Sequence, residues 1–370
     1  MELLIVGGGL AAQRCIEVLR AGGDDRPVTL VCDEPVRPYD RPPLSKEGLL
    51  GEIEPAFRPA GWYADHGVEL RLGVAARSLD PGRHAITLAD GERLHYDELL
   101  IATGSRAREL PGVPRAQVLR SSFDGERLRA ALLEGGPLAV VGAGLIGLEA
   151  AAAARALGVE VTVIEAAPRP LAGILGPRAG AWVTALHRAE GVVVRTGVTV
   201  ERDLGDALEL ADGTRVECAH VLAGIGVRPA ADWLAGSGLD PSGVAVDACG
   251  RTGLPGVYAA GDVTGSGHWE AAARGGTAVA RALLGRAGLP AAPSYFWSDQ
   301  HGVRLQCVGD PRGAAEHVSH GDLASRSFEL DHHLEGRTTA VLLAGRPPSA
   351  LRAARGRLDI PDTTIARRAA

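Results

Sequence analysis

The sequence predicts an α/β protein with two Rossmann-like dinucleotide-binding domains, the first interrupted by the second, and a small C-terminal α+β domain. Two short apolar runs, residues 3–6 and 138–141, each lead into a glycine-rich turn and then an alanine-rich segment. Such a run is typical of a buried parallel strand, and the alanine-rich segment is typical of a helix packed against it. After Pro290 the glycine-rich turns stop, and Phe296 and Trp297 begin a strand-rich tail, which indicates a third domain.

The first glycine-rich turn has the spacing of a dinucleotide fingerprint. Gly7 makes the tight turn, Gly9 lets the backbone approach a pyrophosphate, and the small residues Ala11 and Ala12 let the helix pack closely on the strand. The N-terminus of that helix faces the phosphate charge. A second strand then ends at Asp33, roughly 20 residues further on, where a carboxylate can bind ribose hydroxyls.

The second turn repeats this pattern with Gly142, Gly144 and Gly147, and the strand that follows ends at Glu165. A carboxylate at this position accepts hydrogen bonds from both ribose hydroxyls and repels a 2′-phosphate, so Glu165 favours NAD over NADP. Arg169 lies nearby and is able to bind a phosphate, which leaves the opposite preference open.

Two complete fingerprints in one chain have a functional implication. A single match would be weak, but two matches that are each followed by a strand ending in an acid make coincidence improbable. One chain that holds two dinucleotides suggests a flavin that accepts hydride from a nicotinamide.

The five cysteines are scattered along the chain, with no C-x-x-C motif and no metal-ligand spacing. We therefore expect buried small hydrophobic side chains and no metal site. Electrons must then leave the flavin by a route other than a cysteine pair.

Net charge and hydropathy limit the partners and the cellular compartment that we expect for this protein. The net charge of −6 gives no reason to expect nucleic acid. The chain opens directly on a strand, which leaves no room for a signal peptide, and the longest uncharged stretch, 135–148, is too short and glycine-rich for a membrane helix. We expect a cytoplasmic protein without a membrane partner.

Four short stretches resemble one known family. They are RPYDRPPLSK at 37–46, ATG at 102–104, YAAGD at 258–262 and YFWSDQ at 295–300. With them the chain resembles the pyridine nucleotide-disulfide reductase superfamily, and within it the putidaredoxin reductase-like, NADH-dependent ferredoxin reductases of oxygenase systems.

This resemblance implies non-covalent FAD, NADH and a domain plan. It implies an FAD-binding domain over 1–110 and 238–292, an NAD-binding domain over 111–237 and a C-terminal reductase domain over 293–370. The implied FAD-binding residues are Gly7, Gly9, Ala11, Ala12, Asp33, Lys46, Arg120, Asp262 and Trp269. The implied NAD-binding residues are Gly142, Gly144, Gly147, Glu149 and Glu165, with Gly226 near the nicotinamide.

Lys46 and Glu149 are the residues we expect to be catalytic. A lysine cation beside the isoalloxazine would stabilise the anionic reduced flavin, and Glu149, on the helix after the second fingerprint, would pair with it. The alternative for Glu149 is an ordinary helix acid, and Trp269 is either a flavin neighbour or a core residue. The loop before Trp269 is short and carries His268 where the family has an acid, which leaves contacts at the pyrimidine end of the flavin open.

The function expected from the resemblance is electron transfer from NADH through FAD to a small two-iron ferredoxin that serves a monooxygenase or dioxygenase. Alternatives are a rubredoxin reductase, a nitrite reductase-like NADH flavoprotein subunit, and a redox-sensing flavoprotein without turnover. We expect a monomer or a homodimer.

Ferredoxins of this kind are typically acidic, so a basic docking rim is one interpretation of the arginines. Arginines paired with neighbouring acids are the other. The residues concerned are Arg37, Arg41, Arg304, Arg326, Arg337 and Arg346.

Overall fold

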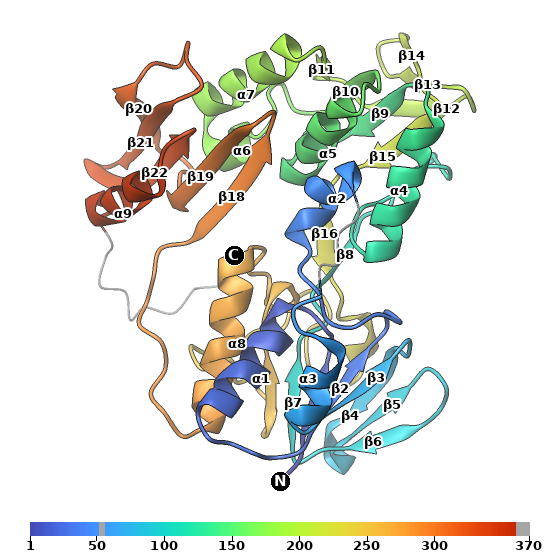
Figure 1. Ribbon diagram of the computed structural model, residues 1–370, viewed down its shortest axis with the longest axis vertical. Coiled ribbons are helices and arrows are strands. Elements are labelled where there is room, and N and C mark those ends of the chain that lie inside the picture. Colours follow the sequence, from blue (N-terminus) through green and yellow to red (C-terminus); the bar gives the residue numbers. More distant parts are fainter. Residues whose placement is uncertain (52–55, 360–370) are drawn as a thin grey trace. The chain divides into compact units, whose positions relative to one another are not determined.

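The computed structural model describes residues 1–51 and 56–359 (Figure 1). Contacts between residues divide the chain into two compact units. The first unit consists of Met1–Arg41, Glu54–Arg106 and Val227–Pro290. The second unit consists of Pro42–Ile53, Ala107–Gly226 and Ala291–Ala370. Each unit is therefore assembled from separate segments of the sequence.

A five-stranded parallel sheet organises the first unit. Strand β1 (Leu3–Val6) pairs with β2 (Val28–Cys32) on one side and with β7 (Glu98–Ile101) on the other. The sheet is completed by β3 (Val68–Leu72) beside β2 and by β17 (Val257–Ala259) beside β7. All four residues of β1 are buried, as expected for a central strand covered on both faces.

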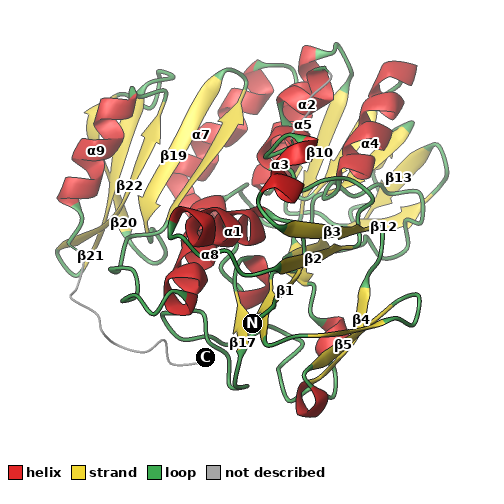
Figure 2. Ribbon diagram, turned by 60° about the horizontal axis from the view of Figure 1, so that its bottom comes forward, coloured by secondary structure: helices red, strands yellow, loops and turns green. Residues whose placement is uncertain are grey.

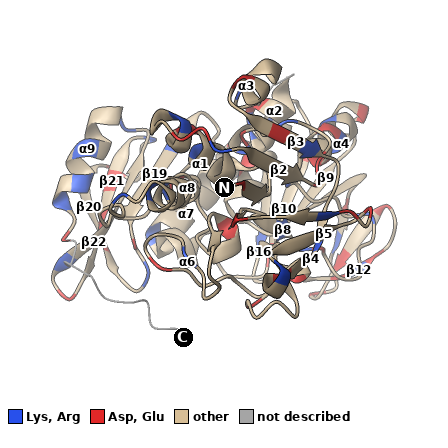
Figure 3. Ribbon diagram, turned by 90° about the horizontal axis from the view of Figure 1, so that it is seen from below, with Lys and Arg blue, Asp and Glu red and all other residues tan. Residues whose placement is uncertain are grey.

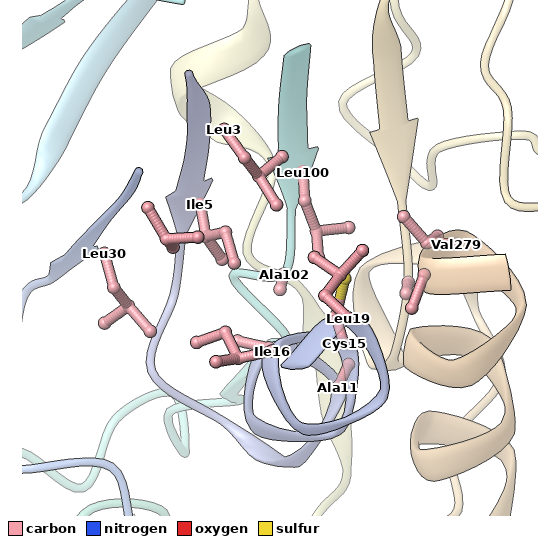
Figure 4. Packing of buried hydrophobic residues seen from close by; sticks show 14 of the residues in the cluster. Leu3, Ile5, Ala11, Cys15, Ile16, Leu19, Leu30, Leu100, Ala102 and Val279 are labelled. Atoms are coloured by element: carbon pink, nitrogen blue, oxygen red, sulfur yellow. The ribbon is translucent and has the colours of Figure 1, made fainter. Parts of the chain in front are cut away.

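Helices α1 (Leu10–Ala21) and α8 (Trp269–Leu283) cover one face of this sheet. Figure 4 shows Ile16 and Leu19 of α1 directed toward Leu3 and Ile5 of β1. Each aliphatic side chain buried in this way contributes about 1.5–3 kcal/mol. The aliphatic residues that follow the first glycine-rich turn at helical spacing thus hold α1 against β1.

Backbone contact joins the two helices. A Cβ added at Gly276 of α8 would lie 2.1 Å from the carbonyl oxygen of Ala11 in α1, so only glycine fits there. The close approach holds α8 against the first turn of α1, immediately after the glycine-rich turn.

The other face of the sheet is covered by a small antiparallel sheet of β4 (Ala76–Asp80), β5 (Ala85–Leu88) and β6 (Arg93–His95). Its buried side chains join those of the parallel strands in one core cluster. The first unit also contains α3 (Ala60–Asp65) and the short 3₁₀ segments η2 (Pro81–Arg83), η3 (Asp232–Leu234) and η4 (Asp262–Thr264). The short strands β8 (Ser105–Ala107) and β16 (Val227–Pro229) pair where the chain leaves and re-enters this unit.

The second unit repeats the parallel arrangement. Strand β9 (Leu138–Val141) pairs with β10 (Val161–Glu165) and β15 (His220–Ala223), and β11 (Val193–Thr196) extends the sheet beside β10. Helix α5 (Leu145–Ala156) follows the second glycine-rich turn and is buried along most of its length. The other elements here are η1 (Pro42–Ser45), α2 (Glu47–Leu50), α4 (Ser122–Glu134), α6 (Ala172–Leu175), α7 (Pro177–Ala189), and the antiparallel strands β12 (Val200–Asp203), β13 (Ala207–Leu210) and β14 (Arg215–Glu217).

The C-terminal part of the second unit is a five-stranded antiparallel sheet in the order β18-β19-β22-β21-β20. Helix α9 (Pro348–Arg357) packs on it through Ala354, against Val308 and Val341 of the sheet (Figure 2). The strands are β18 (Tyr295–Gln300), β19 (Val303–Gly309), β20 (Ala315–Gly321), β21 (Phe328–Leu334) and β22 (Arg337–Ala344).

The predicted fold class is confirmed: two parallel dinucleotide-type sheets, one inserted into the other, are followed by an α+β segment. The predicted domain boundaries stay a prediction, since the division by contacts groups the C-terminal sheet with 107–226. Residues 360–370 of the predicted C-terminal domain lie outside the described residues. No described helix combines the length and apolar character needed to cross a membrane.

Hydrogen bonds join helix α7 to the C-terminal sheet within the second unit. Both carboxylate oxygens of Glu316, on β20, accept backbone N–H groups from the first turn of α7, those of Arg178 (2.8 Å) and Ala179 (3.1 Å). The indole of Trp182 donates to the carbonyl oxygen of Ser325 (3.1 Å). The C-terminal sheet therefore supplies the cap that α7 lacks in its own sequence.

Candidate active site

The first glycine-rich turn has the shape that a pyrophosphate needs. Gly7 has a φ of +109°, and an added Cβ would lie 2.2 Å from the carbonyl oxygen of Ala102 at the end of β7. Gly9 is the N-cap of α1, and a Cβ placed there would meet nothing within 4 Å. No side chain caps the start of α1. Its N-terminal N–H groups thus face open space beside the turn, which suits an anion.

The second turn has the same construction. Gly142 has a φ of +99°, with its added Cβ 2.5 Å from the carbonyl oxygen of Gly224. Gly147 packs on the turn itself, since a Cβ there would lie 2.4 Å from the carbonyl oxygen of Gly142. Gly144 is the N-cap of α5, again without a side-chain cap. The two fingerprints therefore form two turns of similar construction, one in each unit, and phosphate binding by their residues stays a prediction.

The acids that follow the fingerprints differ in their surroundings. Glu165 ends β10, and its carboxylate accepts the N–H groups of Ala143 and Ala167, both at 2.7 Å. It is thus fixed beside the second turn. Asp33 is exposed just after β2, while its neighbour Glu34 accepts the hydroxyl of Tyr39 at 2.7 Å. The roles of Asp33 and Glu165 in ribose binding stay predictions.

Asp262 lies at the carboxyl end of β17, where it begins η4 and accepts the hydroxyl of Ser105 at 2.9 Å. Trp269 begins α8, and its indole N–H donates to Asp40 at 2.8 Å. His268, immediately before it, is partly buried, and burial lowers its pKa below the usual value. All of these residues belong to the first unit, as do Ala11 and Ala12.

Lys46 and Glu149 form a buried ion pair in the second unit. The Nζ of Lys46 lies 3.1 Å from Oε2 of Glu149, and the two side chains are 11% and 4% exposed. Glu149 lies on α5, close after Gly147, so the pair is held on the helix that begins at the second turn. Nζ also lies 5.9 Å from the ring centroid of Trp297 on β18.

Two hydroxyl groups complete the shell of this carboxylate. Ser45 donates to Oε2 of Glu149, and Ser298 donates to Oε1 at 2.6 Å. Removing one member of a buried ion pair typically costs 3–5 kcal/mol, so both charges depend on this geometry. The predicted pairing of Lys46 with Glu149 is present. The catalytic roles of both residues stay predictions.

Sequence reasoning missed Ser45 and Ser298 as ligands of the carboxylate. Both serines stand beside residues of the quoted stretches, Ser45 before Lys46 and Ser298 after Trp297, but nothing in the sequence pairs them with Glu149. Two other predicted residues lie elsewhere in the second unit. The backbone N–H of Arg120 donates to Asp124 at the start of α4, and Gly226 has a φ of +96°. Their roles toward a cofactor stay predictions.

Comparison with known proteins identifies the family. Residues 1–276 match the pyridine nucleotide-disulphide oxidoreductase family, and residues 295–367 match the reductase C-terminal family.

The chain belongs to the pyridine nucleotide-disulphide oxidoreductases.

Relatives cover nearly the whole chain. The ferredoxin–NAD(+) reductase component of the p-cumate 2,3-dioxygenase system of Pseudomonas putida is 39% identical over 350 residues, 89% of this chain and 87% of that protein. The ferredoxin–NAD(+) reductase subunit of benzene 1,2-dioxygenase, also from Pseudomonas putida, is 37% identical over 368 residues, 94% and 90% of the two chains. The crystal structure of a covalent putidaredoxin reductase–putidaredoxin complex superposes with a TM-score of 0.90 at 31% identity, covering 96% of this chain and 93% of that chain.

As a member of this oxidoreductase family, the protein is an enzyme that uses FAD and NAD(H). The two turns fit the two dinucleotides, because each offers a helix N-terminus without a side-chain cap beside a glycine, Gly9 or Gly144, whose added Cβ would meet no atom closer than 3.6 Å. Within the described residues, no cluster of three or more His, Cys, Asp or Glu side chains could hold a metal ion.

The cysteines of this family member are unsuited to disulphide chemistry. All five are free, and four are buried, as expected; only Cys249 is half-buried. Burial raises the pKa of Cys15 and of Cys307 to about 12 and also raises those of Cys32 and Cys218. A thiol with a raised pKa is rarely the thiolate that redox exchange requires.

The arginines proposed as a basic rim are mostly paired. Figure 3 shows basic and acidic residues interspersed along the chain. The pairs are Arg41 with Glu34 and Arg304 with Asp299, both at 2.7 Å, Arg346 with Glu329 at 3.1 Å, and Arg326 with Glu190. Arg37 donates to the carbonyl oxygen of Arg58. The interpretation of arginines paired with neighbouring acids is therefore the better one for these four residues.

Proposed function

We propose that this protein is an NADH-dependent reductase that passes electrons through FAD to a small two-iron ferredoxin of an oxygenase system. The names of its relatives support a ferredoxin as acceptor and an oxygenase as the destination. The location that fits this role is the cytoplasm, where NADH is supplied.

The observation that carries the proposal is the burial of the thiols. Disulphide reductases pass a pair of electrons from the flavin to two cysteines, whereas the thiols of this chain are free and mostly buried with raised pKa values. The segment η1, just before Lys46, contains no cysteine that could accept electrons, because it consists of two prolines, a leucine and a serine. A one-electron acceptor outside the chain is then the natural destination.

A bound FAD would supply the conversion from a two-electron donor to one-electron acceptors, so that one NADH would reduce two ferredoxins and release one proton. The residues of the chain would supply position and charge. The N-termini of α1 and α5 would hold the two pyrophosphates, and Glu165 would bind a ribose. Lys46 would supply a fixed positive charge beside the flavin, and Glu149 would hold that charge in place.

The test is turnover without cysteines. We expect NADH to drive reduction of a purified two-iron ferredoxin, followed by the loss of its visible absorbance. A variant with all five cysteines replaced by alanine should keep turnover within about twofold, since no electron passes through sulfur. Bound FAD, measured by its absorbance, is the control for folding. A cysteine-free variant that keeps FAD but loses turnover would show that electrons do pass through a thiol.

A further inference from the structure

A continuous chain of hydrogen bonds runs from the carboxylate of Glu149 through the second unit. Ser298 donates to Glu149 at 2.6 Å, and Nε2 of Gln300 donates to Oγ of Ser298 at 2.9 Å. Nε2 of His187 lies 3.0 Å from Oε1 of Gln300. Nδ1 of His187 in turn lies 3.1 Å from Nε2 of His301. The chain links α5 to β18, to α7 and to the turn after β18.

The inner members of this chain are cut off from solvent. Ser298 and Gln300 are each 1% exposed, and His187 is 0% exposed. A buried polar group without a partner costs about 1–3 kcal/mol. Three consecutive buried polar side chains are therefore stable here only because each satisfies the next.

The direction of every bond in the chain follows from chemistry. The amide oxygen of Gln300 can only accept, so His187 carries its proton on Nε2. Burial lowers the pKa of His187 to about 4, so the ring is neutral near pH 7 and its Nδ1 accepts from His301. The charged groups that face the two rings are Glu190 for both, and Arg326 and Arg155 for His301. All donors therefore point toward Glu149.

We propose that Ser298, Gln300 and His187 are positioning residues that hold the carboxylate of Glu149 facing Lys46. This inference rests on the proposed function, in which Lys46 and Glu149 act during hydride transfer. Hydrogen bonds that point the same way polarise one another, so the chain strengthens the last bond, from Ser298 to Oε1. Ser45 and Lys46 occupy Oε2, and Ser298 is the donor that fixes the other oxygen.

The C-terminal sheet thereby takes part in the active site as well as in the fold. Ser298 and Gln300 belong to β18, and His187, on α7, is held between Gln300 and His301. Without the donor from Ser298, Oε1 would be a buried acceptor without a partner, and the carboxylate would be free to turn away from Lys46. A carboxylate that has turned away no longer holds Lys46 in place.

The first experiment compares three serine variants by the single-turnover rate of flavin reduction by NADH between pH 6 and 9. Ser298→Ala removes the last donor, Ser298→Thr keeps a hydroxyl, and Ser294→Ala removes a hydroxyl that donates to Gly309 on the same sheet, away from Glu149. We expect Ser298→Ala to slow reduction about tenfold across this range. Ser298→Thr should stay closer to the wild type, and Ser294→Ala should match it.

A profile of Ser298→Ala that coincides with that of Ser294→Ala would overturn the inference. Glu149→Gln separates this outcome from failure of the proposed function. If Glu149→Gln leaves the rate unchanged, the ion pair has no role in hydride transfer. If Glu149→Gln slows the reaction while Ser298→Ala does not, the reductase stands and the positioning chain does not.

The second readout does not depend on turnover. In protein labelled with ¹⁵N-histidine, the ring nitrogens of His187 should report the tautomer with the proton on Nε2 at pH 7. Gln300→Leu removes the acceptor and should convert this signal to a mixture of tautomers. A wild-type His187 that carries its proton on Nδ1 would contradict the direction of the chain and with it the inference.

Discussion

At the residue scale, Glu165 has a structural role besides the one that the sequence predicts. The sequence predicts a contact with a ribose, and the structure shows the carboxylate accepting the N–H group of Ala143 inside the second glycine-rich turn. The charge therefore shapes the turn, and its contact with a ribose stays a prediction. A 2′-phosphate carries about two further negative charges and would be repelled there.

We therefore expect the flavin to be reduced faster by NADH than by NADPH. Glu165→Gln keeps an oxygen that can accept from Ala143 but removes the charge, so it should lower the NADH-to-NADPH ratio of kcat/KM about tenfold with little change in stability. Steady-state kinetics with both nucleotides measure this ratio. Equal rates with the two nucleotides in the wild-type protein would contradict the role given to Glu165.

The surroundings of the Lys46–Glu149 ion pair show which site residues can be predicted from sequence and which cannot. Lys46 and Glu149 were predicted because each lies in or beside a recognisable motif. The partners of Glu149 were not, since Ser298 lies 149 positions away and His187 lies 113 positions from Gln300. No local pattern records a contact over such a separation, and only the packing of β18 against α5 and α7 creates it.

At the element scale, the strands of both parallel sheets and the strand-rich tail followed from hydrophobic patterning. Most strands of the small antiparallel sheets did not. Strands β12 and β14 are three or four residues long and half exposed, so their alternation is too short to distinguish from loop sequence. Helix α9 was missed because it begins with prolines and is arginine-rich, which gives it a weak apolar face.

The cap on α7 is the element-scale feature with the clearest energetic consequence. Glu316→Ala leaves the N–H groups of Arg178 and Ala179 without their acceptor and removes a negative charge from a helix N-terminus. We expect a loss of about 1–2 kcal/mol in the free energy of unfolding. Glu316→Gln, which keeps one acceptor oxygen, should lose less.

Denaturant unfolding of the holoenzyme, followed by circular dichroism, measures both variants. Equal stability of Glu316→Ala and the wild type would mean that water caps α7 equally well.

At the scale of the whole molecule, the buried imidazole of His187 links stability to pH. Its pKa in the folded protein is lowered to about 4 by burial, while a histidine in the unfolded chain titrates near 6.5. As the pH falls below about 6.5, His187 binds a proton in the unfolded chain but stays neutral in the folded protein. Stability is therefore lost between about pH 6.5 and pH 4 and is fully present above this window.

We expect this single group to cost on the order of 2 kcal/mol at pH 5 relative to pH 7. His187→Gln lacks the titrating ring, so its unfolding free energy should fall correspondingly less over the same interval. Comparing each protein with itself at the two pH values removes the cost of the substitution. The same pH dependence in both proteins would mean that the pKa of His187 is not lowered in the folded state.

The discontinuity of the first unit also bears on how the protein is made. Its sheet needs β17 beside β7, and its helix α1 needs the backbone contact with Gly276 of α8, yet both elements are encoded after the inserted segment 107–226. A chain made from its N-terminus thus contains every strand of the inserted sheet before β17 is synthesised. Until then β7 has one unpaired edge, a natural site for a chaperone to protect. The strands of the inserted sheet are therefore all present while the sheet of the first unit still lacks one of its own.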